Sequence, residues 1–301
     1  MTHQTRYSLY VLTASLLASI GTILSEVALR FFLVTPFHIA FLSNIVGGII
    51  LLAPILRQDK NPWHAWPRKD WLRLIVVAFA IYVAGFLMVF TAVDQIGSGK
   101  VTLLSRLETI FIVILAVFFL GEIWSGRHWM ATILALVGTV LINFDPTAWQ
   151  LDFNFGELLT LIGALIFAAG IVLLKPVLDK RGGQLVTGTA LLVAAVFLAF
   201  LFPFLATPIE WHGMIIILLI LMGIFRGTSW SLYNSAMPHI GASRCAILFL
   251  SVAFFTVLLQ VIVDFIHPQL GLQVPSNLFM AVLGGVIIAT SIVIIQRNQG
   301  T

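Results

Sequence analysis

Long apolar segments dominate this chain of 301 residues and restrict its fold class more than any other feature. The hydrocarbon core of a bilayer, about 30 Å thick, is crossed by about 20 helical residues. Ten segments of roughly that length are separated by charged residues, prolines or glycines: 8–33, 38–56, 72–93, 101–120, 128–144, 156–174, 185–205, 214–236, 243–264 and 276–296. We therefore predict an all-α integral membrane protein, with ten transmembrane helices in a single transmembrane domain over residues 1–301.

The composition supports a membrane protein, because 60% of the residues are hydrophobic and only 9% are charged. A soluble globular domain has about a quarter of its residues charged. The net charge of +4 would suggest a nucleic-acid partner in a soluble chain. In a membrane chain, however, loop lysines and arginines have a topological explanation, and no basic patch interleaved with aromatic residues is left over. We therefore expect the chain to lie in a lipid bilayer and to bind no nucleic acid.

The basic residues orient the chain. The first apolar run carries Glu26 and Arg30 and has no small-residue cleavage site, so it reads as a first span and not as a cleaved signal peptide. With the N-terminus in the cytoplasm, twelve of the 16 lysines and arginines lie on the inner side, and Arg106 and Arg226 lie within spans. This asymmetry follows the positive-inside rule. It predicts that both termini are cytoplasmic and that the protein resides in the cell (inner or plasma) membrane.

The chain carries an internal repeat at an offset of 144 residues. TAVDQIGSGKVTLLSRLETIFIVILAV aligns without a gap on SAMPHIGASRCAILFLSVAFFTVLLQV, pairing Gly97 with Gly241 and Phe111 with Phe255. Each Ile-Gly pair falls where we predict a tight turn, after the third and the eighth span. Five spans per repeat is an odd number, so the second copy enters the membrane from the opposite side. We predict two inverted five-helix repeats, over about 8–144 and 156–296.

These segments resemble the drug/metabolite transporter (DMT) superfamily, in particular its ten-helix EamA-type transporters. The resemblance rests on AVDQIGSGKVTLLSRLETIFIVILAVFFLGE, ending in Gly121-Glu122, and on its second-half partner AMPHIGASRCAILFLSVAFF. The chain departs from the family pattern at Thr109 and Ala253, where a proline is common, and at Phe265, which stands where the first repeat has Gly121. The resemblance implies secondary-active transport by alternating access, in which the two halves rock around a central cavity without ATP hydrolysis.

The eighth span is the most polar. Arg226 lies near the middle of the apolar stretch, where a charge costs about 2.5 to 3.5 kcal/mol on insertion scales unless it faces a partner or a water-filled cavity. Helical spacing places Arg226, Trp230, Tyr233 and Asn234 on one face. A guanidinium beside aromatic rings can bind a carboxylate or phosphate while the rings cover an apolar or cationic part of the ligand. We predict a substrate-binding face; the alternative is an arginine permanently paired with an acidic residue, beside aromatics that only pack.

Two further observations concern the same region. Tyr82 falls opposite Arg226 at the 144-residue offset, so inverted symmetry predicts it as a second substrate-binding residue. Gly223 and Gly227 flank Arg226 as a GxxxG pair, for which close helix packing is the favoured interpretation.

Three charged residues lie at similar predicted depths, namely Glu26 on the first span and Arg106 and Glu108 on the fourth. We predict that they form one polar cluster in the outer half, acting as a gate or a proton-coupling site. The alternative is a static ion pair that fixes the helix register. Because residues 106 and 108 point about 200° apart on a helix, only one of them needs to face the cavity.

These features predict a carrier of small polar metabolites that exports amino acids or related carboxylates. Two alternatives stay open: uptake or exchange of a phosphorylated or cationic metabolite such as a quaternary amine, and a lipid-handling membrane protein. The expected partners are a small-molecule substrate, the bilayer and protons. We expect no enzymatic activity, cofactor or metal, since the sequence has no GxxxxGK[ST] loop and no nucleophile-base motif, its histidines lack metal-ligand spacing, and Cys245 is its single cysteine.

Overall fold

The computed structural model describes residues 3–32, 34–59, 61–142, 154–206, 212–270, 272 and 277–296, and within these ranges the secondary structure is entirely helical. The elements are α1 (His3–Phe31), α2 (Pro36–Gln58), α3 (Arg68–Phe79), the π-helix η1 (Ala80–Gly85), α4 (Phe86–Ser105), α5 (Glu108–Leu120), α6 (Gly126–Ile142), α7 (Phe155–Arg181), α8 (Gly183–Leu205), α9 (Gly213–Ile240), α10 (Ala242–Phe249), α11 (Ser251–Ile266), the 3₁₀ helix η2 (Pro268–Leu270) and α12 (Leu278–Gln296). The predicted all-α class is confirmed for these residues.

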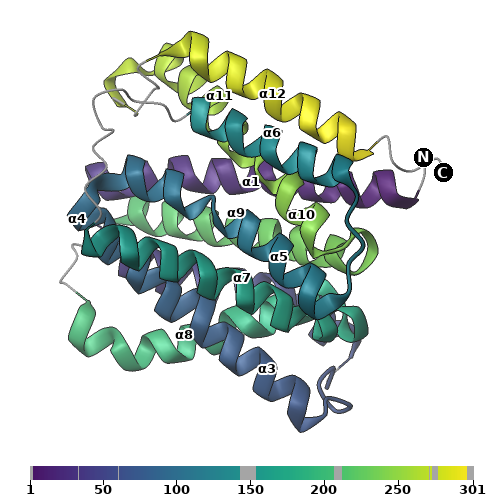
Figure 1. The fold of residues 1–301 in the computed structure, drawn as a ribbon. Coiled ribbons are helices and arrows are strands. Elements are labelled where there is room, and N and C mark those ends of the chain that lie inside the picture. Colours follow the sequence, from purple (N-terminus) through teal and green to yellow (C-terminus); the bar gives the residue numbers. More distant parts are fainter. Residues whose placement is uncertain are drawn as a thin grey trace.

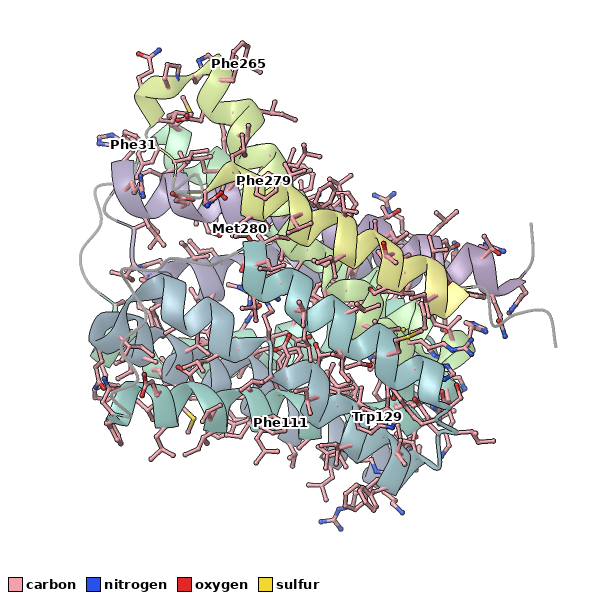
Figure 2. All side chains as sticks on the ribbon, turned by 45° about the horizontal axis from the view of Figure 1, so that its top comes forward. Phe31, Phe111, Trp129, Phe265, Phe279 and Met280 are labelled. Atoms are coloured by element: carbon pink, nitrogen blue, oxygen red, sulfur yellow. The ribbon has the colours of Figure 1, made fainter. Side chains whose placement is uncertain are left out.

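Among the described residues, 8 helices are long and apolar enough to cross a membrane. Two shorter apolar helices, Glu108–Leu120 and His128–Ile142, accompany them. Large apolar side chains on the outer surface fit a lipid surrounding, and Figure 2 shows two of them, Phe265 on α11 and Phe279 on α12. The protein is therefore a multi-pass membrane protein, while the count of ten spans stays a prediction.

The helix ends follow local sequence signals. Asn154 accepts hydrogen bonds from the backbone N–H groups of Gly156 and Glu157, and the Glu157 carboxylate accepts one from the backbone of Asn154, which forms a capping box at the start of α7. Gly121, Gly182 and Gly241 end or separate helices with φ of +67°, +81° and +87°. Positive φ is a conformation that glycine adopts without steric cost, so these ends are encoded locally.

The chain reverses direction within α4, near the predicted turn at Ile96-Gly97. A straight helix of 20 residues would be about 30 Å long. Phe86 and Arg106, at either end of α4, nevertheless line the same cavity, whereas Gln95 and Ile96 contact Gly156 at the start of α7. Figure 1 shows α3 and α5 leading away from the same end of the molecule, at the α4 label. The helical hydrogen-bonding pattern continues through this reversal. The first non-helical residues after it are Arg106 and Leu107.

Two close helix contacts shape the packing. α2 meets α9 where an added Cβ on Gly227 would lie 2.7 Å from the Cα of Gly47, so neither position has room for a side chain. This confirms the predicted packing role of the Gly223/Gly227 pair. α6 meets α12 in the same way, since a Cβ on Gly138 would lie 2.6 Å from the carbonyl oxygen of Gly284. Figure 1 shows α6 and α12 side by side, together with α11, along one side of the bundle that contains α1 and α9.

Candidate functional site

A cavity of about 390 Å³ lies between helices of both halves of the chain. Small-molecule sites have volumes of about 300 to 1,000 Å³, so it has room for a small metabolite. Its polar or aromatic lining includes Thr22 on α1, Ser43 on α2, Tyr82 on η1, Arg106 and Glu108 at the start of α5, and Arg226 and Trp230 on α9.

The cavity lies toward one end of the bundle. Its lining uses the C-terminal part of α1, up to Ser25, and the N-terminal part of α2, from Ile39. On α7 it likewise uses residues of the first half, such as Gly163, whereas on α9 it uses the middle of the helix, from Met222 to Trp230. The cavity is therefore on the side of the loop that joins α1 to α2.

Arg226 lies on the cavity wall and contacts neutral groups. Its Nη1 donates a hydrogen bond to the Ser43 Oγ at 3.4 Å, and its Cζ lies 5.5 Å from the centroid of the Phe86 ring. In the described part of the chain no carboxylate lies within 4 Å of its nitrogens. A guanidinium carries five N–H donors, so most of them remain for a ligand. The predicted alternative, a permanent ion pair with a glutamate, is not what these contacts show.

Trp230 lies at the centre of an aromatic cluster on the same wall. Its ring centroid is 6.4 Å from that of Tyr82, with perpendicular planes, and 5.4 Å from that of Phe167. Phe249 and Tyr233 lie at 5.8 and 5.6 Å. Tyr82 and Trp230 come from different halves of the chain, and Tyr82 lines the same cavity as Arg226, the residue opposite which the offset placed it. The π-helical turn η1 carries Tyr82, and such turns are frequent at functional sites.

Two of the predicted residues on α9 lie deeper than the cavity wall. Tyr233 is buried behind Trp230 and lines a smaller pocket with Glu108 and Phe249. Asn234 is buried against α8, where its Nδ2 donates to the Thr187 Oγ1 at 2.8 Å. The expectation of one shared face is thus corrected for Asn234. The reason is geometric: successive residues on a helix point about 100° apart, so residues 233 and 234 face different neighbours.

The predicted cluster of Glu26, Arg106 and Glu108 is divided in the structure. Arg106 and Glu108 line the cavity. Glu26 forms a salt bridge of 3.2 Å with Arg30 and accepts a hydrogen bond of 3.2 Å from Gln260 on α11, and it is not among the described lining residues. Matching depth along the membrane therefore did not bring the three together, because α1 turns Glu26 toward α11.

Sequence reasoning missed several lining residues. Ser43 precedes Gly47 by one helical turn, so the small-residue face of α2 was a usable signal for it. Phe86, Phe167 and Phe249 had no such signal, since the chain has 24 phenylalanines and their local patterns do not differ.

The end of the bundle away from the cavity is joined by hydrogen bonds between the two halves. Oε1 of Glu122, just after α5, accepts a hydrogen bond from the backbone N–H of Ala242 at 2.7 Å, and Oε2 accepts one from Ser243 at 3.1 Å. The Trp124 Nε1 donates to the Ser243 Oγ at 3.3 Å. Gly241 leaves room for Glu122, whose carboxylate would contact an added Cβ at 3.0 Å. The Gly121-Glu122 pair therefore caps the first turn of α10.

Known proteins are similar to this chain in sequence or in fold. Residues 5–144 match the EamA-like transporter family. The chain is 26% identical over 195 residues to the uncharacterized transporter sll1164 of Synechocystis sp. (strain ATCC 27184 / PCC 6803 / Kazusa), a match that covers 60% of this chain and 56% of the relative. It is 25% identical over 178 residues to the uncharacterized transporter sll0355 of the same organism, covering 54% and 53%. These matches span about half the length of those relatives.

A third relative, the uncharacterized transporter YwfM of Bacillus subtilis (strain 168), is 33% identical over 97 residues, covering 32% of each chain. A crystal structure of a protein with 17% sequence identity superposes with a TM-score of 0.78 and covers 98% of this chain and 99% of the other, which shows a common fold. The first half of the chain is therefore similar to the EamA-like transporter family, and the curated proteins that it resembles are named as transporters.

Proposed function

We propose that this protein is a secondary-active carrier that exports amino acids or related carboxylates across the cell membrane by alternating access. The observation that supports the substrate class is the position of Arg226 on the wall of a cavity of about 390 Å³, with neutral contacts to Ser43 and Phe86. A cation within a span is costly unless something compensates it. A carboxylate bound by the guanidinium supplies that compensation, and the rings around Trp230 cover its apolar part.

The alternating-access mechanism is supported by a shared irregularity in the two halves. α5 begins after a break at Arg106-Leu107, where the backbone N–H of Thr109 donates to the carbonyl of Arg106 at 3.1 Å. α11 begins after a break at Leu250, where Ala253 donates to Leu250 at 3.1 Å. Both pairs are related by the 144-residue offset of the sequence repeat. Carriers that work by rocking have two structurally related halves around one central cavity.

The two ends of the bundle differ in a way that fits one state of such a cycle. The cavity lies toward the α1–α2 loop, which the basic residues predict to be outside. The hydrogen bonds from Ala242 and Ser243 to Glu122 join the halves at the other, predicted cytoplasmic, end. We assign the structure to an outward-facing state. In the export direction, these inner contacts break so that substrate enters from the cytoplasm.

Counterflow into proteoliposomes tests the proposal. Purified protein is assayed against amino acids, organic acids, sugar phosphates and quaternary amines, in parallel with Arg226→Ala and the control Arg57→Ala, which removes an exposed arginine at the end of α2. We expect counterflow of a carboxylate, at least tenfold weaker apparent affinity in Arg226→Ala, and native behaviour in Arg57→Ala. If Arg226→Ala moves the carboxylate with native affinity, or if only phosphates or amines exchange, the proposed substrate class is wrong.

Proton coupling is the second part of the proposal, and Glu108 is the residue that favours it. Its carboxylate lies on the wall of the same cavity as Arg226, where it can exchange a proton with the cavity water. Counterflow and net transport are compared across a pH gradient in the native protein and in Glu108→Gln. Net transport that ignores the gradient in the native protein removes the coupling role.

A further inference from the structure

Opposite charges from the two halves of the chain line the same cavity. Arg226 comes from α9 and Glu108 from the first turn of α5. We propose that Glu108 is a specificity-determining residue, which binds the ammonium group of a zwitterionic substrate whose carboxylate lies on Arg226. This inference rests on the proposed carboxylate site and narrows its substrates from carboxylates in general to amino acids.

Both charged groups, the Arg226 guanidinium and the Glu108 carboxyl group, are available to a ligand. Arg226 contacts the Ser43 hydroxyl and the Phe86 ring. Glu108 interacts electrostatically with Arg106, yet within the described residues no basic nitrogen lies within 4 Å of its carboxylate. The Arg106 Nε is itself buried without a hydrogen-bond partner. The structure therefore holds these charges near one another without joining them in direct ion pairs.

Aromatic rings surround the acidic pole. Glu108 shares the smaller pocket with Phe167, Trp230 and Phe249. An ammonium group is attracted both to a carboxylate and to the face of an aromatic ring, and recognition of ammonium ligands commonly combines the two. A simple carboxylic acid has no ammonium group, so it would place apolar atoms against the Glu108 carboxyl group.

Trp230 links the surroundings of Arg226 to those of Glu108. Trp230 follows Arg226 by four residues, or about 6 Å along the helix axis. Trp230 lines the main cavity with Arg226 and the smaller pocket with Glu108, so it bridges the two poles. An amino acid carries its carboxylate and its ammonium group on the same carbon atom, so with the carboxylate on Arg226 the ammonium group lies in this part of the cavity.

The charge balance also disfavours a free amine. The lining has two arginines, Arg106 and Arg226, and one glutamate, Glu108, so it carries an excess positive charge. An amine without a carboxylate is repelled by this excess positive charge. A zwitterion adds no net charge, and each of its charged groups lies near a side chain of opposite charge.

A matched ligand series measures the role of Glu108. The twenty standard amino acids are first screened for thermal stabilisation of the purified full chain in detergent. Dissociation constants are then measured for the best of them, for its deamino carboxylic acid and for its decarboxylated amine. The variants are Glu108→Gln, Arg226→Ala and Asp179→Asn, the last being an exposed carboxylate on α7 paired with Lys175.

We expect native protein and Asp179→Asn to bind the amino acid at least tenfold more tightly than either analogue. Glu108→Gln should weaken the amino acid about tenfold and leave the deamino acid unchanged, whereas Arg226→Ala should weaken both. If the native protein binds the amino acid and the deamino acid equally, and Arg226→Ala weakens both, the carboxylate proposal stands and the zwitterion proposal falls. If no amino acid binds, or if Glu108→Gln weakens both ligands equally, the role given to Glu108 is overturned.

Discussion

The Oε1 atom of Glu122 lies 2.7 Å from the backbone nitrogen of Ala242, although the two residues are 120 positions apart in the chain. Oε2 of the same carboxylate accepts from the next amide, that of Ser243, so Glu122 occupies the position of an N-cap for α10 from another helix. Negative charge at a helix N-terminus is favoured by the helix dipole. One side chain of the first half thus holds a helix of the second half at the end of the bundle opposite the cavity.

Removing this contact should open that end of the protein. A hydrogen bond to a charged group contributes about 1.5 to 3 kcal/mol, so Glu122→Ala should raise the population of the opened state strongly. Cys245, the single cysteine, is buried in α10 and serves as the reporter. We expect a maleimide reagent to label Cys245 faster in Glu122→Ala than in the native protein, with Glu122→Gln between them. Equal rates in all three would show that Glu122 does not control access; Cys245→Ser supplies the background.

The close contact of α2 and α9 should tolerate no added side chain. A Cβ on Gly227 would lie 2.7 Å from the Cα of Gly47, so Gly227→Val must separate the helices that carry Arg226 and Ser43. Overpacking of this kind costs about 1 to 3 kcal/mol. We expect a lower melting temperature in detergent and weaker substrate binding. Gly213→Val at the start of α9, where nothing lies within 4 Å of the added Cβ, is the control and should melt as the native protein does.

Asn234 should contribute to stability and not to substrate affinity. Its amide donates to Thr187 on α8 and is buried, so Asn234→Ala leaves the hydroxyl of Thr187 without this donor. Loss of a buried hydrogen-bond partner costs about 1 to 3 kcal/mol. We expect a reduced melting temperature with an unchanged dissociation constant for the substrate. A changed dissociation constant at native stability would show that Asn234 takes part in substrate binding. Thr187→Val removes the same hydrogen bond from its other partner.

Arg226→Lys should separate charge from geometry. Lysine keeps the positive charge but cannot form the two parallel hydrogen bonds that a guanidinium makes to a carboxylate. We expect an affinity for a carboxylate substrate about tenfold lower than native and clearly higher than in Arg226→Ala. Equal affinities of the lysine and alanine variants would mean that shape, and not charge, determines binding at this position. Isothermal titration of the purified variants distinguishes these results.

Much of the architecture could be predicted because it depends on local properties of the sequence. The apolar segments predicted a membrane protein, and the predicted reversal at Ile96-Gly97 lies where the chain turns back in α4. At the turn predicted after the eighth span, Gly241 has a φ of +87°. Helical spacing was enough to place Arg226 and Trp230 together on the cavity wall, and the repeat offset paired Arg226 with Tyr82, which lines the same cavity.

By itself, the sequence determined that this chain is a helical membrane protein and that its eighth span carries a charge in need of a partner. Both follow from hydropathy and helical period, which are properties of short stretches. Only the tertiary structure decided which way each helix is rotated about its axis. That rotation turned Glu26 toward Gln260, Asn234 toward Thr187 and Ser43 toward Arg226, over separations of 47 to 234 residues. The spacing of residues along one helix does not specify which face packs against another helix, because that face depends on how all the helices fit together.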